Sequence, residues 1–181
     1  MQRKNVIGVF IAVALLLMIP LLAMQFNSGF VWSLGDFIIA GILLLGAGLT
    51  YEFVSSRSKS IIYRFAVAGA IGSSLFLIWA NLAVGLIGNE NNPANVLFYL
   101  VIMVGIVGAI LSRLKSRGMA RTMFAMATTQ VLVPVVAFLI WRPEFNAGVV
   151  QVFGVTVFFA FLFSASGLLF LQASTADPVK S

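Results

Sequence analysis

Six long apolar stretches alternate with short polar segments along this chain of 181 residues. Each stretch has about the 20 mostly apolar residues that a helix needs to cross the bilayer core. None shows the alternation of apolar and polar residues that is typical of strands in a membrane barrel. The predicted spans are 6–24, 36–53, 62–87, 95–111, 123–141 and 149–171. The pattern predicts an all-α fold, a polytopic transmembrane helix bundle that forms one domain over 1–172 and ends in a cytoplasmic tail, 173–181.

Composition supports a membrane protein and argues against a soluble one. Hydrophobic residues make up 61% of the chain and charged residues 9%, and the mean hydropathy is +1.10. A soluble domain contains about 25% charged residues. Because hydrocarbon offers no hydrogen bonds, a spanning segment must satisfy its own backbone groups, and a helix does so. We therefore expect lipid around most of the chain.

The distribution of charge predicts the orientation of the spans. If the spans alternate in direction, ten of the eleven Lys and Arg residues fall on one side. They are Arg3, Lys4, Arg57, Lys59, Arg64, Arg113, Lys115, Arg117, Arg121 and Lys180. The other side receives Arg142, Asp36, Glu90 and Glu144, with Trp32, Trp79 and Trp141 at its boundary. Because cations near span ends stay on the cytoplasmic side and tryptophans gather at membrane boundaries, we expect both termini inside.

The first span also has features of a secretory signal peptide. A charged start precedes its apolar run, and cleavage near Gln25 would leave five spans. The apolar run is longer than the 7–15 residues typical of a signal peptide, and no clear cleavage site follows it. We favour an uncleaved first helix.

The chain lacks the side chains on which most metal and covalent chemistry depends. It contains no Cys and no His, which removes thiolate or histidine metal ligation and histidine-based catalysis. Met119, Met123 and Met126 have the spacing of a packed helix face rather than of a metal site. The basic pI near 10.4 follows from the positive loops, so it does not indicate nucleic-acid binding. We expect no cofactor, and an enzyme is the least favoured class.

Two acidic residues, Asp36 and Glu52, lie at opposite ends of the second predicted span. Their separation of 16 residues is about 24 Å along a helix, too far for chemistry shared between two carboxylates. Asp36 forms with Ser33 the pattern of a helix capping box. Glu52, near the helix C-terminus, needs a partner there, and Arg57 and Arg64 are the expected ones. Both acids are candidate residues at the membrane boundary.

A layer of polar residues is predicted near the middle of the membrane. Its members are Ser73, Ser74, Thr128, Thr129 and Gln130. Counted from Arg64 and Arg121, the two groups reach the same depth of about 13 Å. The layer either links helices by hydrogen bonds or lines a ligand site beside a break in the fifth helix at Pro134. Under both interpretations Gln130 should face the bundle interior.

Asparagine, glycine and proline dominate the predicted outer loop between the third and fourth spans. These residues favour turns, and Asn95 is expected to cap the fourth helix.

Four segments resemble those of a group of small multipass membrane proteins of bacteria. They are WSLGDF at 32–37, LLLGAGLTYE at 43–52, IWANLAVG at 78–85 and NPAN at 92–95. The resemblance extends from the first span to the fifth. It implies a location in the bacterial inner membrane and supplies no activity.

Three hypotheses for function follow from these observations. The leading one is an accessory or structural membrane protein that acts through contacts with protein or lipid. The second is a channel or transporter for a small solute or ion that uses the polar layer. The third, a membrane enzyme, is weakest. The expected partner is the lipid bilayer, with a second copy or another membrane protein as open alternatives and nucleic acid excluded.

Overall fold

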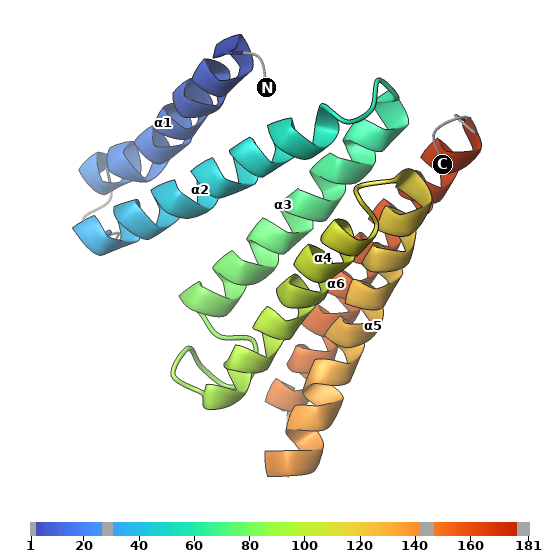
Figure 1. Ribbon diagram of the computed structural model, residues 1–181. Coiled ribbons are helices and arrows are strands. Elements are labelled where there is room, and N and C mark those ends of the chain that lie inside the picture. The colour runs from blue at the N-terminus through green and yellow to red at the C-terminus, as the bar shows by residue number, and fades with distance from the viewer. Residues whose placement is uncertain (1–2, 27–30, 142–146, 177–181) are drawn as a thin grey trace. The chain divides into compact units, whose positions relative to one another are not determined.

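The structure is a computed structural model that describes residues 3–26, 31–141 and 147–176. The described residues form helices joined by short turns, as Figure 1 shows. The elements are α1 (Arg3–Phe26), α2 (Leu34–Ser55), α3 (Ile61–Ala83), the 3-10 helix η1 (Pro93–Phe98), α4 (Tyr99–Leu111), α5 (Ser116–Trp141) and α6 (Ala147–Ala176). Within these described ranges, six helical segments, with η1 and α4 counted as one, are long and apolar enough to cross a membrane. The prediction of an all-helical chain with six candidate spans is therefore confirmed.

Three helix ends differ from those predicted by four residues or more. The third predicted span, 62–87, ends early, because the chain leaves α3 after Ala83 and takes a left-handed backbone at Gly85 and Gly88. The fifth, 123–141, begins early at Ser116, so Arg117 and Arg121 are helical rather than part of a loop. The sixth, 149–171, continues to Ala176, so 173–176 of the predicted tail are helical. Arg142, Glu144, Asp177 and Lys180 lie outside the described residues.

The chain divides into two compact units, 1–57 and 58–181. In the first unit, α1 and α2 pack in opposite directions. A Cβ added to Gly48 would lie 2.6 Å from the Val9 side chain, and one added to Gly41 would lie 3.6 Å from Leu17. Small residues on α2 thus allow close approach, which is typical of helix pairs in membranes.

The predicted capping box begins α2 in this first unit. The backbone nitrogen of Ser33 donates to Asp36 Oδ2 over 2.7 Å, and the Asp36 nitrogen donates to Ser33 Oγ over 3.2 Å. These reciprocal bonds satisfy two groups that a helix start leaves free. Asp36 therefore has a local structural role.

In the second unit, α6 packs antiparallel to both α3 and α5. Tyr63 of α3 stacks edge-on against Phe170, with ring centroids 5.2 Å apart. On the α5 side, a Cβ added to Gly167 would lie 3.2 Å from the Met123 side chain. The buried positions of α6 recur in steps of three and four, the spacing of helices that pack at a shallow angle. They include Thr156, Phe159, Phe163, Ser166, Phe170 and Ala173.

Helix α4 packs closely against α5 in the same unit. A Cβ added to Gly105 would lie 2.8 Å from the sulfur of Met126, and one added to Gly108 would collide with Thr122. Glycine at these two positions therefore brings the helix backbones together. The Tyr63 hydroxyl donates to the carbonyl of Leu114 over 2.7 Å, which ties the α4–α5 turn to α3.

Candidate functional site

The structure separates the five residues of the predicted polar layer into two groups. Gln130 of α5 is fully buried and Ser73 of α3 is buried. Thr128 is exposed and donates to the Phe124 carbonyl of its own helix over 2.9 Å. Ser74 and Thr129 make the same kind of bond, to carbonyls four residues earlier. The latter three hydroxyls are satisfied locally, so Ser73 and Gln130 remain as candidates for a shared interior site.

The packing on α6 places Ser73 and Gln130 at similar levels. Gly167 lies opposite Met123, so antiparallel packing brings Gln130 opposite about residue 160. Gly69 lies opposite Ser166, so Ser73 comes opposite about residue 162 by the same reasoning. By this count Gln130 on α5 and Ser73 on α3 both lie at the level of the middle of α6.

Gln130 is unusual because its side-chain amide is buried without hydrogen bonds to any residue that the structure describes. Neither Oε1 nor Nε2 has a hydrogen-bond partner among the residues that the structure describes. An unsatisfied buried polar group costs about 1–3 kcal/mol. Its neighbours on the buried face of α5 are apolar, among them Met126, Val133 and Pro134.

Pro134 leaves the backbone carbonyl of Gln130 without its usual donor, so a third polar group lies beside the two side-chain atoms of Gln130. Helix α5 continues through Pro134 to Trp141, so the structure lacks the helix break at this residue that the ligand-site alternative included. Proline has no backbone N–H, and in a helix it leaves the carbonyl four residues earlier without its usual donor. That carbonyl belongs to Gln130. The spacing of Gln130 and Pro134 is visible in the sequence and identifies which carbonyl is freed.

The second boundary acid, Glu52, is linked to α1. Its Oε2 accepts a hydrogen bond from Asn5 Nδ2 over 2.8 Å. The guanidinium carbon of Arg57, an expected partner, lies 4.7 Å from the centroid of the Phe53 ring. Asn5 could not be predicted as this partner from the sequence, because the contact depends on the antiparallel pairing of α1 with α2. Within the described ranges, no three acidic residues come close enough to hold a metal ion.

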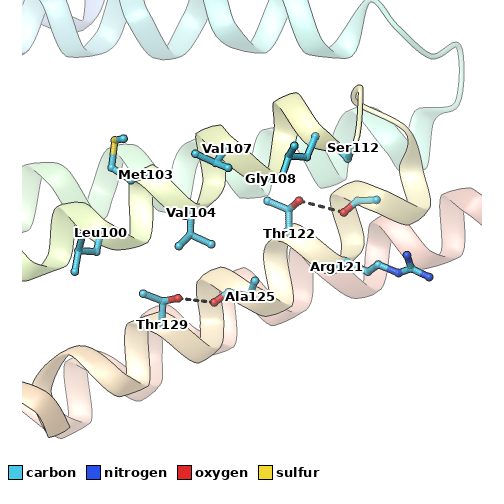
Figure 2. A pocket seen from close by; sticks show the side chains of 12 residues that line it. Leu100, Met103, Val104, Val107, Gly108, Ser112, Arg121, Thr122, Ala125 and Thr129 are labelled. Carbon is cyan, nitrogen blue, oxygen red and sulfur yellow. Dashed lines mark hydrogen bonds between the residues drawn. The ribbon is translucent and has the colours of Figure 1, made fainter.

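A surface groove runs between α4 and α5, and we name it the α4–α5 groove (Figure 2). Its volume is about 770 Å³. Apolar side chains of α4 line most of it, and Ser112 and Arg121 lie toward one end. The groove is lined by Leu100, Met103, Val104, Val107, Gly108, Leu111, Ser112, Gly118, Arg121, Thr122, Ala125 and Thr129. The hydroxyls of Thr122 and Thr129 donate to carbonyls of their own helix, so they add little polarity to the groove.

The turn between α4 and α5 contains two residues in the left-handed region. Arg113 has φ 50° and Leu114 has φ 60°. The nitrogen of Leu114 donates to the Ala109 carbonyl over 3.2 Å, and that of Arg113 to the Ile110 carbonyl over 3.0 Å. These bonds form a Schellman motif, in which glycine is usual at the position of Arg113. A residue other than glycine costs about 1–2 kcal/mol there.

At the opposite end of α4, Asn95 organises the connection from α3. Its Oδ1 accepts from the nitrogens of Leu86 and Ile87 over 2.9 and 2.8 Å. Its Nδ2 donates to the carbonyls of Ile87 and Asn89 over 3.3 and 2.6 Å. The prediction that Asn95 caps the fourth helix is therefore wrong. Asn92 is the cap of η1, and Asn95 is buried inside η1 and fixes the preceding loop.

A second hollow of about 110 Å³ lies near this connection, between Asn92, Ala137 and Phe153. Ser73 and Gln130 line neither this hollow nor the α4–α5 groove.

Comparison of the chain with protein families, curated proteins and solved structures finds no match to any of them. The resemblance to small bacterial multipass proteins therefore stays a prediction.

Proposed function

We propose that this chain is an accessory or structural protein of the bacterial inner membrane, with six spans and both termini in the cytoplasm. It acts through contacts with lipid or with other membrane proteins. The part of the chain that the structure describes has six helical segments long and apolar enough to cross a membrane, which supports the membrane location. The one-sided distribution of Lys and Arg supports the orientation.

The observation that carries this proposal is that large side chains fill the interior of the second unit, 58–181. Large side chains occupy its interior, among them Tyr63, Phe98, Phe159, Phe163 and Phe170, each at most 1% exposed. On α6, Thr156 and Ser166 are separated by Phe159 and Phe163 on the same buried face. An interior of this kind favours a protein that works through its surface over one that conducts through its middle.

Transport of a small solute or ion is the second candidate. Its support is the buried amide of Gln130, unpartnered among the described residues, together with the backbone carbonyl that Pro134 frees. Three polar groups at one mid-helix residue would suit a ligand at the centre of the membrane.

Reconstitution separates these two candidates. We expect vesicles that contain the protein to release trapped potassium, protons or chloride no faster than protein-free vesicles. Flux that Gln130→Leu abolishes and Thr128→Leu preserves would replace the accessory role with transport. Flux that survives Gln130→Leu would exclude a midplane site at this residue, although it would still contradict the accessory role.

Thiol labelling tests the orientation. Because the chain contains no cysteine, the unsubstituted protein measures the background labelling. Asn91 and Ser56 are both exposed, on the proposed outer and inner loops. In intact cells, a maleimide that cannot cross the membrane should label the Asn91→Cys variant. It should label the Ser56→Cys variant only after the inner membrane is permeabilised. The reverse pattern would place the termini outside.

A further inference from the structure

The α4–α5 groove is bordered at one end by a concentration of positive charge. Arg113 and Lys115 lie in the turn, and Arg117 and Arg121 lie in the first two turns of α5. All four are exposed, and Arg121 also lines the groove. No Asp or Glu occurs anywhere in 99–141, so neither helix nor the turn supplies a countercharge. The end of the groove is thus suited to an anion.

The remainder of the groove matches an acyl chain. Its α4 wall extends from Leu100 to Leu111, about 17 Å at the helical rise. One leaflet contributes about 15 Å of the 30 Å hydrocarbon core. Met103 and Val107 on this wall are 54% and 47% exposed, so the groove is open along its side. A lipid could enter laterally from the bilayer without any movement of the helices.

The conformation of the turn points to the same ligand. Arg113 occupies a left-handed position where glycine would be unstrained, so the turn places a cation there at a cost in stability. The hydrogen bond from Tyr63 to the Leu114 carbonyl holds this turn against α3. The cations beside the groove are therefore carried on a fixed turn.

We propose that the α4–α5 groove binds one anionic phospholipid of the cytoplasmic leaflet. An acyl chain lies along Leu100, Met103, Val107 and Leu111, and the phosphate lies near Arg121 and the cations of the turn. This inference rests on the membrane location and orientation proposed above, and it names the lipid with which the protein makes its contact.

Native mass spectrometry of the delipidated full-length protein in detergent tests the proposal. We expect one phosphatidylglycerol to remain bound under conditions that remove phosphatidylcholine. Arg121→Gln should weaken this binding about five-fold, the effect of removing one cation near an anionic headgroup. Arg64→Gln is the matched control, because Arg64 is exposed at the inner end of α3 and does not line the groove. It should leave binding unchanged.

The apolar half of the site needs its own variant. Val107→Trp should fill the groove and abolish retention of phosphatidylglycerol without a change in charge. Ile110→Trp is its control, because Ile110 is exposed on α4 and does not line the groove. Glycerol phosphate, which carries the anion without the chains, should not displace the lipid.

Several results would overturn the lipid site. Equal losses in Arg121→Gln and Arg64→Gln would indicate diffuse attraction to anionic lipid, and equal retention of phosphatidylcholine would indicate a site without charge selectivity. A dimer that Val107→Trp converts to a monomer would show that a second copy occupies the groove.

Each of these results would leave the labelling pattern and the absence of flux unchanged, so failure of the lipid site can be told from failure of the proposed function. Inverted labelling would refute the orientation and the lipid site together, whereas flux would refute the accessory role alone.

Discussion

Replacement of Asn95 by alanine is expected to lower the free energy of unfolding by about 3 kcal/mol, because four hydrogen bonds end on this one buried side chain. Its loss leaves two nitrogens and two carbonyls of the α3–η1 loop without their partner. Thermal denaturation in detergent, followed by tryptophan fluorescence, measures the effect.

Asn91→Ala is the control for this prediction. Asn91 is exposed in the same loop, and its side chain donates to Glu90 Oε1 over 3.3 Å. A surface change of this kind should alter stability by less than about 0.5 kcal/mol. Asn95→Asp keeps the accepting oxygen but turns a second oxygen toward two carbonyls, so it should be as harmful as alanine. If all three variants melt alike, Asn95 does not hold the loop.

Replacement of Gln130 by leucine is expected to stabilise the protein by about 1–3 kcal/mol. The amide is fully buried and unpartnered within the described chain, and leucine of similar size removes the cost of burying it. Chemical denaturation in mixed micelles measures the change.

Thr128→Leu provides the comparison, because Thr128 is exposed and already satisfied by the Phe124 carbonyl. It should change stability by no more than about 0.5 kcal/mol. A large loss of stability in Gln130→Leu would mean that the amide makes bonds that stabilise the folded protein. A gain in stability would mean that Gln130 is kept for a reason other than stability, as polar residues inside membranes commonly are.

Local features were predictable from the sequence because their causes lie within a few neighbouring residues. The Ser33–Asp36 capping box joins residues three apart, and the sequence identifies it without any knowledge of packing. The burial of Gln130 followed from the cost of exposing an amide to hydrocarbon. The end of α3 was misplaced because 84–87 are apolar enough to continue a span. In the structure Gly85 instead takes a left-handed backbone and lies so close to Asn89 and Asn95 that a Cβ would collide with them.

The partners of polar side chains were beyond the sequence. Asparagine is a common capping residue, yet the four side-chain hydrogen bonds of Asn95 reach back to 86–89. Which groups Asn95 bonds depends on how α3 and η1 meet. Glu52 bonds to Asn5, which is distant in sequence and adjacent only because α1 and α2 pack in opposite directions.

By itself, the sequence determined that the chain is helical, how many candidate spans it has and where its charges concentrate. Each span satisfies its backbone locally, so length and apolarity are sufficient to identify it. Only the tertiary structure decided which faces meet, which of five mid-depth polar residues are buried, and that a groove lies beside the cations of the α4–α5 turn. The physical reason is that lipid is as apolar as a protein interior, so residues that face lipid and residues that face another helix have the same composition. Phe161, 67% exposed, and Phe163, fully buried, lie two residues apart on α6 and differ only in what packs against them.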